Sequence, residues 1–293
     1  MRAARVAALA VLGGCAAVPQ VAEIPPARVQ PPPERATQAP ARAGFAFEGA
    51  MIQGGAVLGT APSHSVRLSL DGKPVALAAD GRFLIAFDRD AAPVATLSAT
   101  LAGGGEARET LAVAPRDWRI ERLPTLPRVS QPSAEFQRRR PGELAQIAAA
   151  RTVASDSQGW RQRFVWPATG RISGLFGAQR VYAGEPGAYH SGVDVARPTG
   201  TPIVAPADGV VTLAAPADFT LEGRLLMLDH GMGLNSAFLH LSRIDVRVGD
   251  RVRQGQVIGA IGATGRATGP HMHWGMKWND ARIDPLLLVG PMP

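Results

Sequence analysis

Side chains that could bind a metal ion lie in two short motifs in the C-terminal part of the chain. His190 and Asp194 are four residues apart in the first motif, and His271 and His273 are two residues apart in the second. In extended chain, residues an even number of positions apart point to the same face. Two histidines and one carboxylate suit a catalytic zinc ion, because three protein ligands leave the fourth tetrahedral position open for water.

The distribution of histidine supports one shared site. Five of the six histidines lie from His190 onward, and His240 falls between the two motifs in the segment Phe238–Ser242. A single His-x-His pattern is weak evidence for a metal, but an aspartate at ligand spacing in the same region strengthens it. The isolated His64 is expected at the surface, and His230, in Asp-His-Gly, is expected to support a turn.

These motifs resemble the signature of lysostaphin-type (LytM-type) zinc endopeptidases, which cut peptide bonds in bacterial peptidoglycan. The motifs are His190-x-Gly192-x-Asp194, His240-Leu241-Ser242 and Gly269-Pro270-His271-Met272-His273, and the resemblance covers about residues 166–290. It implies that His190, Asp194 and His273 bind one Zn²⁺ per chain, with His240 and His271 as the catalytic pair. Met272 and Phe238 stand where the family often has leucine and tyrosine, and neither change removes a ligand or a catalytic nitrogen.

The division of labour within the catalytic pair stays open. One histidine can take the proton of the attacking water and pass it to the leaving amine, and the other can hydrogen-bond the oxyanion. The chain has no HExxH glutamate that could take the proton instead. Asp208 and Asn279 are candidates to orient the ligand imidazoles. Glycines near the motifs are expected to permit turns and close approach; they are Gly192, Gly265 and Gly269.

Composition limits the classes of partner. With 31 basic and 24 acidic residues the chain carries a formal charge of +7. Nucleic-acid binding is not expected, because the arginines are scattered and no stripe of basic and aromatic residues is visible. An anionic partner such as cell wall or membrane headgroups fits the charge.

The N-terminus resembles an export signal. Two arginines precede the apolar run Val6–Leu12, which Gly13-Gly14-Cys15 follows. This run is too short to span a bilayer, and the order of charged, apolar and small residues is typical of a signal peptide. Leu-Gly-Gly-Cys also resembles a lipobox, which implies lipidation of Cys15 and anchoring to the outer membrane. The alternative is an ordinary signal peptide cut near Ala16-Ala17; both readings predict export to the periplasm.

The chain divides into five predicted segments: a signal peptide or lipobox (1–15), a proline-rich linker (16–43), a small β domain (44–125), a helical linker (126–163) and a zinc metallopeptidase domain (164–293). In the small β domain, apolar residues alternate around Asp71-Gly72 and Asp80-Gly81, which predicts hairpins in an antiparallel sandwich. Trp118 is expected to be a packed anchor. The helix is predicted from Glu143 to about Gln158, and the arginines at 138–140 just before it are expected to be solvated.

The C-terminal segment reads as compact β structure with glycine-rich turns. Its predicted strands are Ile203–Ala205, Gly209–Leu213, Leu225–Leu228, Val246–Val248 and Val257–Ile261. The fold class is therefore mainly β, with an antiparallel β peptidase domain preceded by a small β-sandwich-like domain and a linking helix. Biotinyl and lipoyl carrier domains share the pattern around Val248–Gly259, but that region has no lysine for the cofactor.

The sequence thus predicts an exported zinc endopeptidase of peptidoglycan. The lipoprotein-like anchor suggests a cross-link between D-alanine and diaminopimelate as the scissile bond. In the proteins that this chain resembles, a segment such as the helical linker can restrict access to the cleft, so autoinhibition by the linker is an alternative role for it. The alternative is a non-enzymatic, wall-binding activator of a separate amidase, which would keep the metal for structure only.

Overall fold

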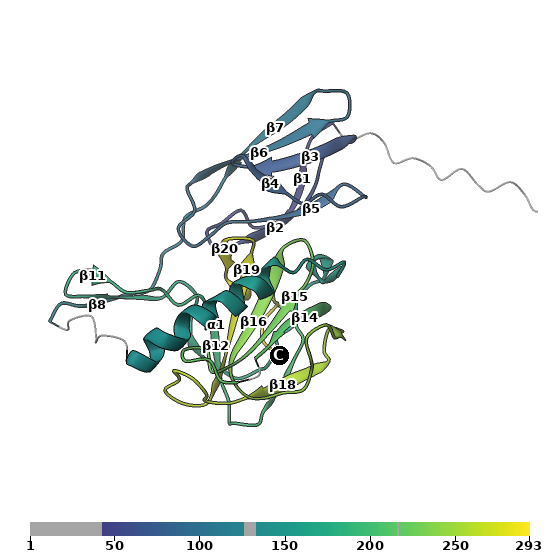
Figure 1. Cartoon of the computed structure of the whole chain (residues 1–293). Coiled ribbons are helices and arrows are strands. Elements are labelled where there is room, and N and C mark those ends of the chain that lie inside the picture. The colour runs from purple at the N-terminus through teal and green to yellow at the C-terminus, as the bar shows by residue number, and fades with distance from the viewer. Residues whose placement is uncertain (1–42, 126–132, 216) are drawn as a thin grey trace, which may run out of the picture. The chain divides into compact units, whose positions relative to one another are not determined.

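Antiparallel β-sheets are the main regular structure of the computed structural model, which describes residues 43–125, 133–215 and 217–293 (Figure 1). The predicted mainly-β class is therefore confirmed. The predicted leader with Cys15 and nearly all of the proline-rich linker lie outside the described residues. Among the residues described, no helix has the length and apolar character needed to cross a bilayer. The described residues all belong to one compact unit.

Two sheets form the first β region. One has the order β1-β2-β5, with β1 Ala46–Gly49, β2 Ala56–Thr60 and β5 Arg82–Ala86. The other has the order β4-β3-β6-β7, with β4 Lys73–Val75, β3 Ser65–Leu70, β6 Val94–Leu101 and β7 Glu106–Ala112. Alternate side chains of these strands fill a shared core, and those of Val57, Phe83, Ile85 and Leu97 are fully buried.

Only one of the two Asp-Gly turns closes a hairpin. Asp71-Gly72 joins β3 to β4, with Leu70 opposite Lys73. Asp80-Gly81 also forms a turn, but the strand that follows it pairs with β2 and not with β4. The second predicted hairpin is therefore wrong, because the chain crosses from one sheet to the other at this turn.

A ten-stranded sheet carries the metal-binding motifs. Its main path runs β17 (Arg251–Val252), β14 (Gly209–Ala214), β15 (Arg224–Asp229), β16 (Leu234–Ile244), β19 (His271–Trp278), β12 (Gly192–Ala196) and β9 (Arg171–Gly174). Off this path, β13 (Pro202–Val204) pairs with β18 (Val257–Ile261), β18 also pairs with β16, and β20 (Ala281–Ile283) pairs with β19. A separate sheet joins β11 (Glu185–Pro186), β10 (Gln179–Tyr182) and β8 (Ile120–Leu123).

Alternation along the central strands gives the large sheet two different faces. On β19, Met272, Trp274 and Met276 point into the main core. The opposite face carries His271 and His273, and we call it the site face. Neighbouring residues on this face from β14, β15 and β16 form a second apolar cluster with Ile147 and Ala150 of helix α1.

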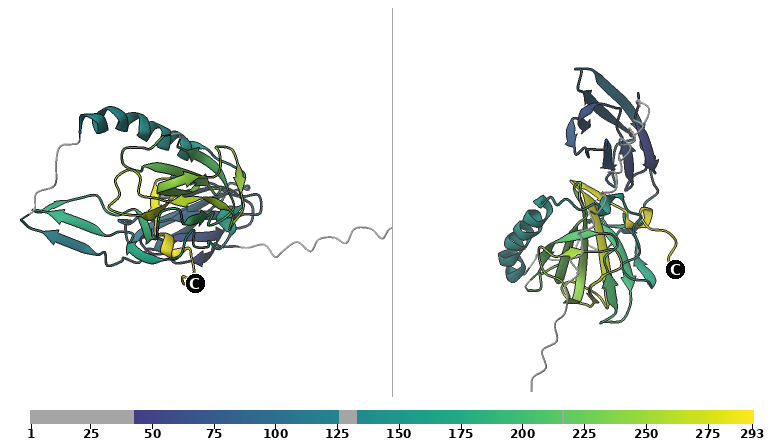
Figure 2. Two further views of the ribbon diagram at one scale, coloured as in Figure 1. Left: turned by 90° about the horizontal axis from the view of Figure 1, so that it is seen from below. Right: turned by 90° about the vertical axis from the view of Figure 1, so that its right-hand side faces the viewer.

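Helix α1 (Ala134–Thr152) lies against one face of the large sheet in all views (Figures 1 and 2). It begins nine residues before the predicted start, at an N-cap where Ser133 accepts a hydrogen bond from the backbone N of Phe136. It ends six residues before the predicted end. The carboxylate of Asp229 accepts hydrogen bonds from both the backbone N and the hydroxyl of Ser155, so the chain continues there in extended form.

The strand pattern of the sequence did not predict β16, which lies in the middle of the large sheet. Four of the five predicted strands of the C-terminal segment exist, but residues 246–248 lie in a loop and turn before β17. The eleven-residue β16, which carries His240, was not predicted. Two short 3₁₀ helices, Gly159–Arg161 and Pro285–Leu287, complete the described secondary structure.

Candidate metal centre and active site

Three predicted ligands converge on one point of the site face. The Nε2 atom of His190 lies 3.0 Å from Oδ1 of Asp194 and 3.0 Å from Nδ1 of His273. Nδ1 of His273 lies 2.9 Å from the same carboxylate oxygen. Three donor atoms at about this spacing can share one ion with bonds of about 2.0–2.2 Å, so the residues fit a divalent metal.

Strand register brings two of these ligands together. Asp194 on β12 is the direct partner of His273 on β19, so their side chains share a face. His190 precedes β12, and its backbone is held by hydrogen bonds with Gly177 and Ala178. The strand itself begins at Gly192, so His190 lies just before it.

Glycine residues leave space for the metal centre. Gly174 on β9 lies opposite Asp194, and a Cβ atom there would collide with the carboxylate. A Cβ atom at Gly192 would collide with the backbone oxygen of Trp274 and crowd the ring of His273. The prediction of close approach is confirmed for Gly192. It is wrong for Gly269, where an added Cβ would meet open space.

Hydrogen bonds fix the ligand side chains before any ion arrives. Nδ1 of His190 lies 3.0 Å from the backbone oxygen of Leu175. A carbonyl only accepts, so this nitrogen carries the proton and Nε2 keeps its lone pair for a metal. Burial raises the pKa of Asp194, but hydrogen bonds with His190 and His273 outweigh it and leave that pKa well below its ordinary value. Asp194 therefore offers an anionic oxygen.

Opposing effects also act on the ligand imidazoles. Burial alone lowers the pKa of His190, but the hydrogen bonds with Asp194 and Leu175 leave this pKa raised in the metal-free chain. Burial lowers the pKa of His273, and the hydrogen bond to Asp194 only partly opposes it. The neutral form that binds a metal is thus favoured at His273.

The two remaining histidines of the motifs lie next to each other beside the ligands. The ring centroids of His240 and His271 are 4.8 Å apart, and Nε2 of His271 is 3.9 Å from Oδ1 of Asp194. Nδ1 of His240 donates to the backbone oxygen of Thr264 at 2.8 Å, and Nδ1 of His271 donates to that of Gly269 at 2.8 Å. In both rings Nε2 is then left free to accept a proton.

A β-bulge turns His240 toward this site. The pairing of β15 with β16 shifts register between Arg224–Leu241 and Leu226–Phe238, which leaves one extra residue on β16. In a regular strand His240 would point to the same face as Phe238, which lies in the main core. At the bulge His240 instead adopts the left-handed backbone conformation (φ 64°) and its ring lies against His271 on the site face.

Burial favours the neutral form of His240. It lowers the pKa of the imidazole, and the hydrogen bond to the carbonyl of Thr264 only partly opposes this effect. The side chain can therefore accept a proton near neutral pH.

The candidates proposed to orient the ligands do not do so. Asp208 accepts hydrogen bonds from His230 and Gln254, and the side chain of Asn279 lies against Gly233. The observed partners of the histidine rings are backbone carbonyls. Every residue has one, so a sequence motif cannot indicate which carbonyl will be the partner. His230 is fully buried between Asp208 and the hydroxyl of Ser236, and so it supports the turn region as predicted.

Two cations lie side by side farther along the site face. Lys277 follows His273 on the same face of β19, and Arg282 of β20 is its direct cross-strand partner. Asp280, an almost fully exposed residue, lies 3.6 Å from the Lys277 ammonium. Burial, followed by repulsion from Arg151 at the end of α1, lowers the pKa of Lys277. Arg282 donates to the hydroxyl of Tyr189, the residue before His190.

Comparison with known proteins places the site within a described family. The model of Peptidase family M23 matches residues 188–285, which contain all five motif residues. The DD-carboxypeptidase/endopeptidase Mpg of Neisseria meningitidis is 37% identical over 123 residues, which is 42% of this chain and 28% of that protein. The peptidoglycan DD-endopeptidase ShyC of Vibrio cholerae is 39% identical over 117 residues, which is 39% of this chain and 26% of that protein. The chain thus spans little more than a quarter of the length of these relatives.

A solved structure extends the likeness beyond the matched region. The crystal structure of a peptidase M23 from Pseudomonas aeruginosa is 32% identical, with a TM-score of 0.62. The match covers 83% of this chain and 96% of that one. The likeness therefore includes most of the described β structure and not only the strands that carry the ligands.

Proposed function

Because the chain belongs to peptidase family M23, we propose that it is an exported, zinc-dependent endopeptidase that hydrolyses peptide bonds in bacterial peptidoglycan. The observation that carries this proposal is the convergence of five side chains on one face of the sheet. Three of them offer ligand atoms to one ion, and two further imidazoles stand beside them, each with Nδ1 bound to a backbone carbonyl.

His190, Asp194 and His273 would hold the ion. A zinc ion bound there supplies a Lewis acid for the peptide carbonyl and a water molecule of lowered pKa. His240 or His271 takes the proton of the attacking water at Nε2 and delivers it to the leaving amine. The other imidazole donates to the oxygen that becomes negatively charged. Because Nδ1 of each ring donates to a backbone carbonyl, the base takes its proton at Nε2, and the ring that stabilises the oxyanion donates from Nε2 in its protonated form.

The names of the relatives support a D,D-peptide bond as the scissile bond. Mpg is described as a DD-carboxypeptidase/endopeptidase and ShyC as a peptidoglycan DD-endopeptidase. We propose that the same class of cross-link, between D-alanine and diaminopimelate, is cut here. Export to the periplasm, and anchoring through Cys15, rest on the leader sequence alone.

We propose that Lys277 and Arg282 recognise a free carboxylate of the stem peptide. Like charges directly opposite each other on a strand pair are unfavourable, and an anion between them would remove the repulsion. Stem peptides of peptidoglycan carry free carboxylates near the scissile bond. The pair lies on the strand face that also carries His271 and His273, where a bound peptide would extend.

Digestion of purified sacculi tests the enzyme proposal. The zinc-loaded protein should release shortened cross-link peptides, identified by mass, and both EDTA and His273→Ala should abolish the release while circular dichroism is unchanged. If metal-loaded protein that is correctly folded releases nothing, the proposal is wrong. The non-enzymatic alternative predicts full biological activity for a protein with both His240→Ala and His271→Ala, whereas the enzyme proposal predicts none.

A further inference from the structure

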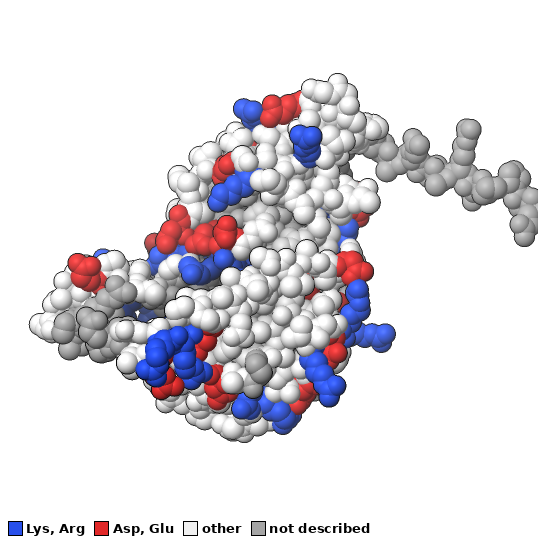
Figure 3. All heavy atoms as spheres, in the orientation of Figure 1, with Lys and Arg blue, Asp and Glu red and all other residues white. Residues whose placement is uncertain are grey.

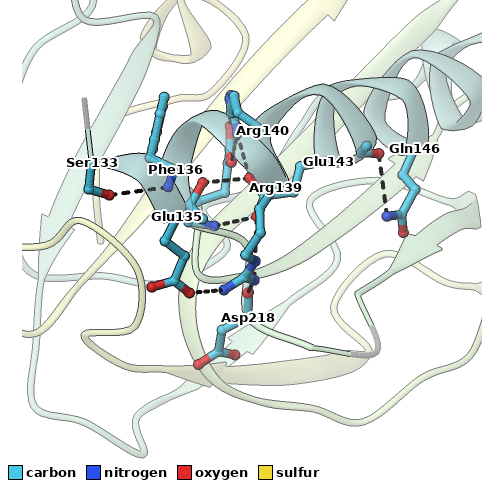
Figure 4. A network of polar contacts seen from close by, with 11 residues as sticks. Ser133, Glu135, Phe136, Arg139, Arg140, Glu143, Gln146 and Asp218 are labelled. Carbon is cyan, nitrogen blue, oxygen red and sulfur yellow. Dashed lines mark hydrogen bonds and ion pairs between the residues drawn. The ribbon is translucent and has the colours of Figure 1, made fainter. Parts of the chain in front are cut away.

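Buried charges connect helix α1 to a tight turn between β14 and β15. The carboxylate of Glu143, which is 5% exposed, accepts hydrogen bonds from the backbone N of Thr220 at 2.8 Å and from its hydroxyl at 2.6 Å. The guanidinium of Arg140 donates to both carboxylate oxygens of Glu222, at 2.6 and 2.7 Å. Arg140 also lies 3.3 Å from Glu143. Figure 4 shows both α1 side chains pointing to the same side of the helix. We call these four residues the α1 brace.

The turn held by the brace is closed on itself. Phe219 and Gly223 exchange two backbone hydrogen bonds, of 2.8 and 2.9 Å, and Thr220 and Glu222 lie between them. The side chain of Phe219 is buried in the apolar cluster that includes Ile147 and Ala150 of α1. The turn therefore sits on the helix through both polar and apolar contacts.

The other side of this turn holds His240. The backbone N of His240 donates to the backbone oxygen of Glu222 at 2.9 Å. Gly223 packs closely on Thr264, and the backbone oxygen of Thr264 accepts the hydrogen bond from Nδ1 of His240. The hydroxyl of Thr264 in turn accepts from the backbone N of Arg224 at 2.9 Å. One turn thus fixes both the backbone and the ring of His240.

His240 needs such support because its backbone conformation is costly. A residue other than glycine in the left-handed region is strained and persists only where its surroundings impose that conformation. A displacement of about 1 Å at a catalytic group can lower the rate about a hundredfold. The contacts to Glu222 and Thr264 impose both the conformation and the ring position.

We propose that Arg140 and Glu143 of helix α1 are positioning residues that hold the catalytic His240 through the turn 219–223. The inference rests on the proposed function for the role of His240. It gives α1 a supporting role in catalysis, whereas autoinhibition by the linker would make the helix lower the activity. A helix that only restrained access would raise activity when its contacts are removed, whereas the α1 brace predicts a loss.

The first test is kinetic and uses full-length, zinc-loaded protein. Arg140→Ala should lower kcat about tenfold to a hundredfold, with KM within about twofold and the bound zinc unchanged, because the ligands do not contact the brace. Arg138→Ala, an exposed arginine of the same helix, is the matched control and should match the parent protein. Glu143→Ala should lower kcat in the same way. Glu143→Gln keeps a side-chain oxygen that can accept from Thr220, so its kcat should be close to that of the parent protein.

The second test does not depend on activity. Hydrogen exchange at the His240 amide reports directly on its bond to Glu222, and Arg140→Ala should speed this exchange at least about tenfold. The amide of Met272 on β19 serves as an internal control. Unchanged exchange at His240, or a kcat equal to that of Arg138→Ala, would overturn the inference, and so would a rise in kcat. If Arg140→Ala does not fold, Thr220→Val removes one brace contact and takes its place in both measurements.

The two measurements separate the two proposals. An inactive parent protein would reject the enzyme proposal, while the exchange data would still decide whether the brace holds His240.

Discussion

At the scale of single residues, the geometry of the metal centre depends on residues outside the ligand motifs. Asp194 has room for its carboxylate because Gly174 has no side chain. His190 keeps its lone pair for the ion because the carbonyl of Leu175 holds its other nitrogen. Neither feature belongs to the ligand motifs, yet both determine where the ligand atoms lie.

Gly174→Ala should weaken metal binding about tenfold to a hundredfold, the range typical of changes next to ligands. The new Cβ would push the Asp194 carboxylate away from His190 and His273. Competition with a chelator measures the affinity. Gly269→Ala, which adds a methyl group into open space, is the control. Equal zinc affinity in the two variants would contradict the role given to Gly174.

His230 should make stability depend on pH. Burial lowers its pKa to about 4 from an ordinary value of 6.5, so the folded state binds the proton less readily than the unfolded state. Its contribution is complete above pH 6.5 and is lost as the pH falls toward 4, by about 3 kcal/mol.

Urea unfolding at several pH values between 4 and 7 checks this expectation. His230→Gln should flatten the dependence of the unfolding free energy on pH, whatever its effect at pH 7. His64→Gln, at an exposed position, should leave the slope unchanged. A slope that survives in His230→Gln would assign the acid sensitivity to other groups.

The types of the site residues were predictable, and their partners were not. Spacing and resemblance identified His190, Asp194 and His273, and the structure brings these three together. The groups that hold the histidine rings are main-chain carbonyls of Leu175, Thr264 and Gly269. Every residue type carries a carbonyl, so only the folded backbone reveals which ones lie within reach. The roles of the residues in catalysis stay predictions.

At the scale of elements, the bulge in β16 shows where pattern reading fails. Alternation assigns His240 to the same face as Phe238, in the core. One extra residue in β16 reverses that assignment. The position of a bulge depends on pairing with β15, β18 and β19, whose sequences lie far away along the chain. Local sequence therefore predicts the histidine but not the face on which it lies.

A buried ion pair joins the start of a short helix to a distant loop. Asp284, which is 1% exposed, caps Pro285–Leu287 and lies 2.8 Å from the guanidinium of Arg116. Arg116→Ala would leave a buried carboxylate without its partner and should destabilise the fold by about 3–5 kcal/mol. Arg108→Ala breaks an exposed pair and should destabilise the fold far less than Arg116→Ala does. Thermal or urea unfolding compares them, and equal stabilities would contradict the assignment.

At the scale of the whole molecule, the excess of positive charge is not gathered on one visible surface. Figure 3 shows basic and acidic side chains interspersed over the face that it presents. A net charge of +7 still favours an anionic polymer over long distances, and salt should screen that attraction. Lys277 and Arg282 on the site face are the pair that we propose for local recognition of an anionic group.

Lys277→Ala should lower kcat/KM about three- to tenfold on stem peptides with free carboxylates, and far less on amidated peptides, because it removes one of the two charges. The effect should shrink as salt is raised from low to physiological concentrations. Lys73→Ala removes the chain's other lysine, an exposed residue on β4, and should leave kcat/KM unchanged. Equal losses on both kinds of peptide would point to packing and not to charge.

The small sheet β8-β10-β11 has a consequence for how the protein could be divided. β8 comes from residues 120–123 and pairs in parallel with β10, which leads by way of β11 into the loop that carries His190. A recombinant fragment that begins after β8 but still contains β10 would leave β10 with a bare edge, shortly before the ligand His190 in the chain. Such a fragment should self-associate through that edge, and any fusion that carries the metal site together with β10 would also have to include residues 120–123.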